Sequence, residues 1–234
     1  AEDLRDNLVG PLVLAGECAD ANVALACIAT GCIFEGTDFT EEDRPNYFGS
    51  SYSCVKGATD QLLHALFAHS ALWFRIRMPI THDLHPRSFL TKILTYEKIC
   101  SNTNSMSVLD GPAGLLGLFV RMALAGYRGC YNGCNPGALS HDEILVMYRE
   151  TVDPTFVWQN FTAEEQAEVL LAGRSNNTLD STKLAAAAAH CEVAVPTGSD
   201  TAVATMLRDQ LGALIRECDA EVKRRLDGGS FGHG

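Results

Sequence analysis

Val23-Ala-Leu-Ala-Cys-Ile-Ala29 is an unbroken apolar run that ends at Thr30-Gly31, as is typical of a strand buried on both faces of a parallel sheet. A polar segment follows, and a helix is then predicted from Ser50 or Ser51, as N-cap, to about residue 69. Ala71-Leu-Trp-Phe-Arg-Ile-Arg-Met78 is a second apolar strand, stopped by a proline. Strand, helix and strand in this order form a βαβ unit, so the sequence predicts an α/β protein with a parallel sheet.

The remaining sequence mixes helices with short strands. A capping box is predicted at Ser140 and Glu143, where one more helix begins. Hydrophobic periodicity predicts helices over 1–21, 89–98, 112–124, 163–172, 181–190 and 199–226, and strands over 106–109 and 129–132.

Composition excludes several classes of function. Lys and Arg number 18 against 29 Asp and Glu, a net charge of −11, so we expect no binding to nucleic acid. The nine cysteines include no CxxC pair and favour free thiols in a reducing cytoplasm. No run approaches the ~18 apolar residues of a membrane span, and residues 1–20 show no signal pattern, so we expect a cytoplasmic protein without a membrane partner.

One group of residues has a spacing that suggests chemistry. Tyr52 and Lys56 lie one turn apart on the predicted helix, and Thr30 ends the strand before it. Ligands of open α/β sheets bind at the carboxyl ends of strands, so the three side chains can meet in one crevice. A carbonyl reductase needs a proton donor and a group that orients the ketone oxygen, and a neighbouring ammonium favours the phenolate of a tyrosine. Alone, Tyr-x-x-x-Lys is a weak motif that also occurs on solvated surface helices.

Several further segments follow in a recognisable order. Together with these motifs the chain resembles the nucleotide-rhamnose synthases, epimerase-reductases related to the dTDP-4-dehydrorhamnose reductases in the extended short-chain dehydrogenase/reductase family. The resemblance covers about residues 1–185. It rests on Ala29-Thr-Gly-Cys-Ile-Phe-Glu35, Tyr52-Ser-Cys-Val-Lys56, Arg75-Ile-Arg-Met-Pro-Ile80, Phe89-Leu-Thr-Lys-Ile93, Asn104-Ser-Met-Ser-Val-Leu-Asp110, Asn135-Pro-Gly137, Ser140-His-Asp-Glu-Ile144 and Arg174-Ser-Asn-Asn-Thr-Leu-Asp180.

The resemblance implies a fold and an activity. The expected fold is the C-terminal part of a Rossmann-like parallel sheet with helices on both faces, plus a smaller α+β substrate-binding region. The expected activity is NADPH-dependent (or NADH-dependent) reduction at C4 and epimerisation at C3 and C5 of UDP-4-keto-6-deoxy-glucose, or of its dTDP counterpart, which yields UDP-L-rhamnose from the UDP sugar. The expected divisions are residues 1–80, 81–195 and 196–234, and the chain is a possible homodimer.

The resemblance also assigns residues. Thr30, Tyr52 and Lys56 would be the reductase triad, and Asn7 would support the lysine through water. The nicotinamide side would be lined by Met78, Pro79 and Ile80, and the nucleotide-sugar side by Asn135, Arg174, Asn176 and Asn177.

Epimerisation requires acid–base groups on both sides of the sugar ring. Cys32 and Lys92 lie in family-like motifs and have suitable chemistry. Each also has a simpler interpretation, a buried thiol at a strand end for Cys32 and a surface lysine for Lys92. His82 and His85 have the spacing of metal ligands but lack a third ligand, so we expect no metal.

The chain departs from the family at its start. The family begins with a strand, a glycine-rich phosphate-binding loop and a helix, and no such segment precedes the Thr30 strand here. We therefore expect either a fragment of a longer enzyme or a non-catalytic nucleotide-sugar-binding or regulatory subunit. We also expect the strand at 23–29 to be an exposed apolar sheet edge.

Overall fold

The computed structural model describes residues 2–81, 89–110, 114–151, 153–162, 165 and 173–191. The helix expected over 199–226, most of that over 163–172, and His82 and His85 lie outside the described residues. Within the described part, no helix has both the length and the apolar character needed to cross a membrane.

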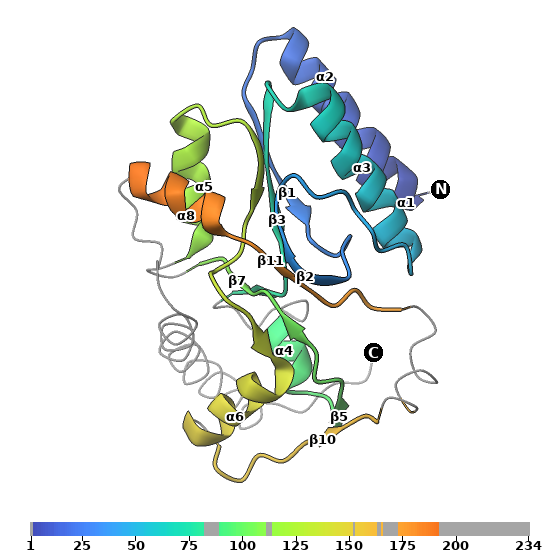
Figure 1. Cartoon of the computed structure of the whole chain (residues 1–234), viewed down its shortest axis with the longest axis vertical. Coiled ribbons are helices and arrows are strands. Elements are labelled where there is room, and N and C mark those ends of the chain that lie inside the picture. The colour runs from blue at the N-terminus through green and yellow to red at the C-terminus, as the bar shows by residue number, and fades with distance from the viewer. Residues whose placement is uncertain are drawn as a thin grey trace, which may run out of the picture.

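The predicted βαβ unit is confirmed (Figure 1). Strand β1 (Leu25–Thr30), helix α3 (Ser51–Phe67) and strand β3 (Ala71–Ile76) follow one another, and β8 (Gly129–Asn132) completes a parallel sheet of order β1-β3-β8. Thr30 is in register with Ile76 at the carboxyl end of the sheet. The residues that follow the two strands therefore lie at the same, carboxyl, edge of the sheet.

Helices cover both faces of this sheet, as the sequence predicts (Figure 1). One face carries α3 and an N-terminal helix made of α1 (Glu2–Leu4), the π-helical turn η1 (Arg5–Val9) and α2 (Gly10–Asp20). The other face carries α5 (Leu115–Leu124) and α8 (Thr182–His190).

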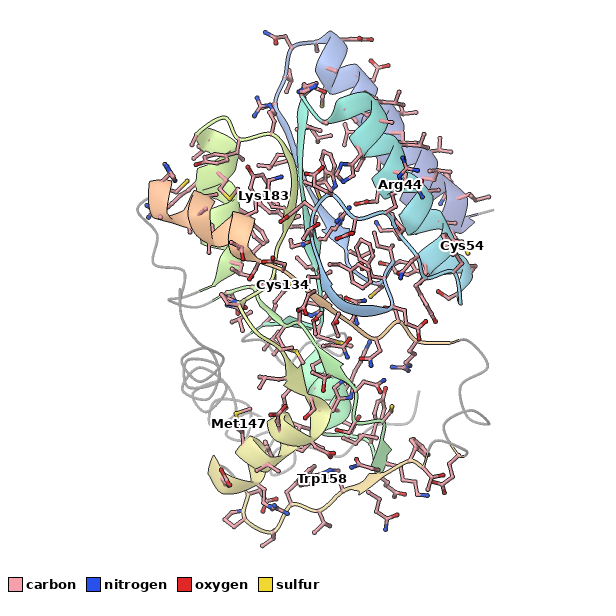
Figure 2. All side chains as sticks on the ribbon, viewed as in Figure 1. Arg44, Cys54, Cys134, Met147, Trp158 and Lys183 are labelled. Carbon is pink, nitrogen blue, oxygen red and sulfur yellow. The ribbon has the colours of Figure 1, made fainter. Side chains whose placement is uncertain are left out.

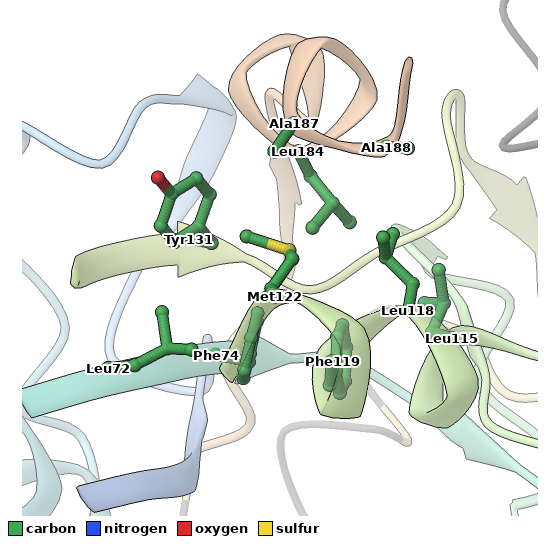
Figure 3. Close-up of a cluster of buried hydrophobic side chains, with 10 residues drawn as sticks. All are labelled: Leu72, Phe74, Leu115, Leu118, Phe119, Met122, Tyr131, Leu184, Ala187 and Ala188. Atoms are coloured by element: carbon green, nitrogen blue, oxygen red, sulfur yellow. The ribbon is translucent and has the colours of Figure 1, made fainter. Parts of the chain in front are cut away.

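Alternate residues of β3 supply the cores of the two layers, as a strand buried on both faces must. Trp73 packs towards the α2 and α3 side with Leu63 and Ala15. Phe74 packs towards α5, where its ring stacks on Phe119 with centroids 3.9 Å apart. Figure 3 shows this second cluster, in which small side chains on α8 face the sheet: Leu72, Phe74, Leu115, Leu118, Phe119, Met122, Tyr131, Leu184, Ala187 and Ala188.

Strand β1 differs from the expectation of a strand buried on both faces. In the described residues it pairs with β3 alone, so it is an edge strand, and its side chains alternate in exposure. Val23 and Ile28 are 56% and 47% exposed. An apolar run is a sufficient signal for a strand, but its burial depends on a neighbour on each side. The expected exposed apolar edge is confirmed.

A second region lies beneath the carboxyl edge of the sheet and has its own core. That core contains Ile80, Ile93, Ile99, Met106, Val108, Leu139, Ile144, Leu145 and Met147. The region consists of β4 (Pro79–Ile80), α4 (Phe89–Ile93), β5 (Lys98–Ile99), β6 (Thr103–Asn104), β7 (Ser107–Val108), β9 (Leu139–Ser140), α6 (His141–Thr151) and β10 (Gln159–Asn160).

Local hydrogen bonds set the helix boundaries. Ser50 accepts a bond of 3.1 Å from Ser53 N and begins α3, and the predicted box of Ser140 and Glu143 forms in both directions. The helix expected over 89–98 is wrong in length: α4 ends at Ile93, and the hydroxyl and N–H of Thr95 both bond to the Lys92 carbonyl.

Several two-stranded sheets were absent from the sequence-based prediction, among them the pair of β2 (Gly36–Phe39) and β11 (Asn177–Leu179). Strand β2 lies in the segment interpreted as a polar loop, and it pairs in parallel with β11. This pairing brings the segment after β1 against a segment about 140 residues later in the chain, at the level of Asp38 and Thr178. No local sequence pattern predicts such a contact.

Candidate active site at the carboxyl edge of the sheet

Thr30 is the centre of the site. It is 8% exposed, at the last position of β1. Its Oγ1 accepts a hydrogen bond of 3.0 Å from the main-chain N–H of Cys32, and its hydroxyl is hydrogen-bonded to the phenol of Tyr52. The structure therefore brings together Thr30, Tyr52 and Cys32, three residues that the sequence singled out.

The start of α3 places Tyr52 next to this strand end. The loop before the helix packs closely, because a Cβ on Gly57 would lie 3.2 Å from Pro45 Cβ. Tyr52 and Lys56 then lie one turn apart on the same face of α3.

The charge state of Tyr52 differs from the expectation. We expected the Lys56 ammonium to lower the pKa of this phenol, but burial raises the pKa, and the hydrogen bond from Thr30 opposes that rise only in part. The carboxylate of Asp3 and the sulfur of Cys32 raise the pKa further, and Arg77 lowers it. Tyr52 is therefore a neutral phenol at pH 7, and the raised pKa makes it a weaker acid than an ordinary tyrosine.

Lys56 lies in a partly enclosed pocket. A cavity of about 70 Å³ is lined by Thr30, Lys56, Thr59 and Asp60 together with apolar atoms of β1 and α2. Burial lowers the pKa of Lys56, and the nearby Cys27, Asp3 and Asp60 oppose this shift. Lys56 forms no ion pair within the described residues, so its ammonium is available to hydroxyl groups of a ligand.

Asn7 has a different arrangement from the one that the resemblance implies. Its side-chain amide donates a hydrogen bond of 2.7 Å to Asp3. Its main-chain carbonyl accepts a bond of 2.5 Å from Thr59 Oγ1. Asn7 lies in the π-helical turn at Arg5–Val9, and such turns are frequent at functional sites. The contact from this helix towards the lysine pocket is thus made by the backbone of Asn7.

The other candidates from the sequence are three for the cofactor side and one for epimerisation: Met78, Pro79, Ile80 and Lys92. They lie on both sides of the junction between the sheet and the second region beneath its carboxyl edge. Met78 has a left-handed φ of 38°, a strained value for a residue with a side chain. Pro79 is half-buried and Ile80 is fully buried, so Ile80 contributes to the core of the lower region. Lys92 is exposed on α4 and has no side-chain contact with Cys32 in the described residues.

The predicted substrate residues divide into two groups. Asn177 is 1% exposed, and its amide donates to the carbonyls of Gly31 and Phe34 at 2.9 and 2.8 Å. Asn135 is equally buried, and its Oδ1 accepts from the N–H of Val108. These two asparagines hold the loops of the site in place.

The other two predicted substrate residues are open to a ligand. Arg174 is exposed, and its charge lies close enough to His141 to lower the pKa of that imidazole. Asn176 is half-buried, and its Oδ1 has no hydrogen-bond partner among the described residues.

Sequence reasoning missed Tyr47. This residue is 7% exposed, and its hydroxyl has no hydrogen-bond partner in the described part of the chain. The hydroxyl lies between Gly49 and Gly173, where an added Cβ would be 2.4 and 2.6 Å away, and burial together with Glu35 and Cys32 raises its pKa. The sequence signal for this close packing was the pair of Gly49 and Gly173. These glycines are separated by more than a hundred residues, so the sequence alone does not connect them.

Asp60, His64 and Cys130 form a group whose potential metal ligands lie within 4.8 Å of one another. The guanidinium of Arg75 already holds both oxygens of Asp60, at 2.9 and 2.7 Å, and lies 3.1 Å from His64 Nε2. The Arg75 guanidinium is therefore the cation that already occupies this group of potential ligands.

A glycine spacing of the dinucleotide-loop type occurs at Gly111, Gly114 and Gly117, the last of which lies in α5. It follows β7, which pairs with β4 and lies outside the β1-β3-β8 sheet. An added Cβ on Gly117 would meet nothing within 4 Å, so no close approach requires this glycine. The spacing therefore does not make this segment a phosphate loop. Gly111 lies outside the described residues.

A strand-end threonine beside a Tyr-x-x-x-Lys helix on a parallel sheet covered by helices defines the class of the short-chain dehydrogenase/reductases. No family model matches the chain. An uncharacterized protein of Acanthamoeba polyphaga mimivirus is 48% identical over 191 residues, which cover 78% of this chain and 65% of that protein. The bifunctional dTDP-4-dehydrorhamnose 3,5-epimerase/dTDP-4-dehydrorhamnose reductase of Arabidopsis thaliana is 47% identical over 193 residues, covering 78% of this chain and 62% of that protein.

The mimivirus protein has a solved structure, described as a UDP-rhamnose synthase, which matches with a TM-score of 0.76 and 44% identity over 86% of this chain and 71% of that one. The chain belongs to this family of UDP-rhamnose synthases and rhamnose epimerase-reductases, as the sequence motifs predict. It spans slightly less than two thirds of the length of the two curated relatives.

Proposed function

We propose that the protein reduces the C4 ketone of a nucleotide-linked 4-keto-6-deoxy sugar and epimerises C3 and C5 of the same sugar, with UDP-4-keto-6-deoxy-glucose as substrate and UDP-L-rhamnose as product. The observation that carries the proposal is the pair of contacts at Thr30, which joins the phenol of Tyr52 to the backbone of Cys32. Both relatives with functional descriptions support the same reaction class.

The reduction requires a proton for the oxygen that forms at C4. Thr30 holds the Tyr52 hydroxyl in place, and this phenol is protonated at neutral pH because burial raises its pKa. Tyr52 can therefore donate its proton to the oxygen as negative charge develops there. General acid catalysis of this kind contributes about 10²- to 10⁴-fold to the rate.

Epimerisation requires removal of a proton from the carbon next to the ketone and its return on the opposite face. Cys32 is half-buried two residues after Thr30, close to the expected position of the ketone oxygen. We assign proton removal to its sulfur, and the second acid–base role to Lys92, which is exposed on α4.

NADPH (or NADH) is the proposed cofactor, and when bound it supplies a hydride to C4. The residues present fit its ribose and nicotinamide end. Lys56 offers an unpaired ammonium to ribose hydroxyls, Tyr52 lies one turn away, and Met78 and Pro79 are half-buried at the end of β3. The nucleotide sugar is assigned to the side of Arg174, which is exposed, and Asn176, whose Oδ1 has no hydrogen-bond partner among the described residues.

The test uses the protein expressed from its complete reading frame, with UDP-4-keto-6-deoxy-glucose and NADPH in D₂O. We expect NADPH consumption and a rhamnose product that carries deuterium at C3 and C5. Tyr52→Phe should abolish NADPH consumption and leave deuterium exchange in place. The exposed Tyr96 provides the control, and Tyr96→Phe should behave as the wild type. Absence of exchange and of reduction in the wild type would refute the proposal.

A second candidate function is a non-catalytic nucleotide-sugar-binding or regulatory subunit. Titration of the 234-residue chain with NADPH, followed by nicotinamide fluorescence, distinguishes the two. Micromolar binding would contradict the non-catalytic alternative.

Compartment, assembly and domain division are further proposals. Eight described cysteines are free thiols, which favours a reducing compartment such as the cytoplasm. A cofactor-binding part, residues 1–80, and a mixed part, residues 81–195, stay predictions, since the cluster around Phe74 contains residues of both. A homodimer is a further prediction, which light scattering during size-exclusion chromatography would test.

A further inference from the structure

Arg77 is a buried cation beside Cys32. The side chain is 1% exposed, and its Nη1 donates a hydrogen bond of 2.8 Å to the Cys32 sulfur. It forms no ion pair with a carboxylate within the described residues. Burial of an unpaired charge is costly, so a site built around Arg77 favours an anion next to it.

The other contacts of Arg77 use its terminal nitrogens inside the protein, whereas its buried Nε has no hydrogen-bond partner among the described residues. Nη1 also donates to the hydroxyl of Ser175 at 3.0 Å, and Nη2 donates to Asn104 Oδ1 and to the Ser175 carbonyl. The four hydrogens of the two terminal nitrogens are therefore all used inside the protein. Three of these acceptors are neutral oxygens, and Cys32 is the one acceptor in this group that can become an anion.

The sequence around Cys32 is adapted to this contact. A Cβ on Gly31 would lie 2.8 and 2.9 Å from Cδ and Cγ of Arg77, so the glycine makes room for the arginine stem. The backbone N–H of Cys32 is held by Thr30, so the sulfur is fixed between the catalytic threonine and the guanidinium.

We propose that Arg77 is a positioning residue for Cys32: its guanidinium holds the sulfur in place and balances the negative charge of the thiolate form. This inference rests on the proposed function, in which Cys32 removes a proton from the sugar. When the thiol ionises, its proton goes to solvent, and the negative charge on sulfur is balanced by the guanidinium.

The test measures thiolate reactivity rather than turnover. Iodoacetamide alkylates a thiolate: a carbon–sulfur bond forms, the carbon–iodine bond breaks and iodide leaves. Each cysteine is followed by peptide mass spectrometry over pH 6 to 9. Cys54 is exposed on α3, with its sulfur near the Phe48 carbonyl and no arginine contact, and it serves as the reference within the same sample (Figure 2).

In Arg77→Met, alkylation of Cys32 relative to Cys54 at pH 7 should fall about tenfold, because a charge-assisted hydrogen bond is lost. Arg77→Lys should restore part of the rate, because the charge remains. An unchanged ratio in folded Arg77→Met would overturn the proposal. Unfolding would be recognised by alkylation of the buried Cys130 and Cys134.

A second measurement does not depend on folding of the arginine variants. The wild type should show more thiolate absorbance near 240 nm than Cys32→Ser at pH 7. A difference that appears only above about pH 8.5, where an ordinary thiol ionises, would overturn the proposal. If Arg77 controls Cys32 but Cys32→Ser retains deuterium exchange at C3 and C5, the proposed epimerase role fails and the Arg77 assignment stands.

Discussion

The main-chain N–H of Cys32 donates a 3.0 Å hydrogen bond to Oγ1 of Thr30, and the hydroxyl of the same threonine is bonded to Tyr52. The groups assigned to epimerisation and to reduction are thus coupled through a single side chain. Thr30 accepts the bond from Cys32, and its hydroxyl also lies close enough to Tyr52 to affect the pKa of that phenol. One bound ketone can therefore meet both groups without leaving the site.

Cys32→Ala should separate the two half-reactions. The backbone bond to Thr30 remains in this variant, so the geometry of Tyr52 is preserved. We expect reduction of an already epimerised 4-ketone within about twofold of the wild-type rate, whereas deuterium exchange at C3 and C5 should fall at least 10²-fold. The measurement is proton NMR of the sugar in D₂O. Exchange at the wild-type rate would transfer the proton-removing role to another residue.

Lys56→Met should weaken both cofactor binding and turnover. The ammonium lies in the pocket shared with Thr59 and is the group assigned to the ribose hydroxyls. We expect the KM for NADPH to rise about tenfold, because hydrogen bonds to a charged group are worth about 1.5–3 kcal/mol. Lys98→Met, which removes an ammonium 2.6 Å from Glu165 in the lower region, is the matched control and should leave KM unchanged.

The sequence was sufficient to predict the βαβ unit, the caps at Ser50 and Ser140, and the placing of Tyr52 and Lys56 one turn apart on α3. These features depend on local periodicity and on short spacings, which a single sequence displays directly. It was insufficient for the β2–β11 pairing and for the length of α4, because these depend on contacts with distant segments and on side-chain bonds such as that of Thr95.

Charge effects within the site were also beyond sequence reasoning. The expected influence of Lys56 on Tyr52 assumed that proximity on the helix decides the pKa of the phenol. In the structure burial has the larger effect, and burial is a property of the packed site rather than of the helix. The contact between Arg77 and Cys32 joins residues 45 positions apart, and no spacing rule covers it.

Tyr47→Phe should stabilise the protein in the absence of ligand. The phenol hydroxyl is buried without a hydrogen-bond partner among the described residues, and an unsatisfied buried polar group costs about 1–3 kcal/mol. We expect the free energy of unfolding in urea to rise by about 1 kcal/mol. Tyr96→Phe, at an exposed position, should change stability by less than about 0.5 kcal/mol. Loss of stability in Tyr47→Phe would show that the hydroxyl has a partner in the native state.

His64 should make stability depend on pH. Nε2 of His64 lies 3.1 Å from Nη2 of Arg75, so the neutral imidazole accepts a hydrogen bond that protonation would remove. Burial lowers the pKa of His64 below 6.5, helped by Arg75 and Lys183 and opposed by Asp60 and Glu42. The ring also meets Trp73 edge-on.

The direction of this pH dependence of stability follows from the uptake of a proton by His64. The unfolded chain binds a proton at His64 near pH 6.5, whereas the folded protein binds it only at lower pH. The contribution of His64 is therefore fully present above pH 6.5 and is lost as the pH falls towards the folded-state pKa. One proton limits the slope to about 1.4 kcal/mol per pH unit. His64→Gln retains an acceptor for Arg75 and does not titrate, so its urea midpoint should fall less than that of the wild type between pH 7.5 and 5.5. Parallel decreases in the two proteins would show that another group causes the loss.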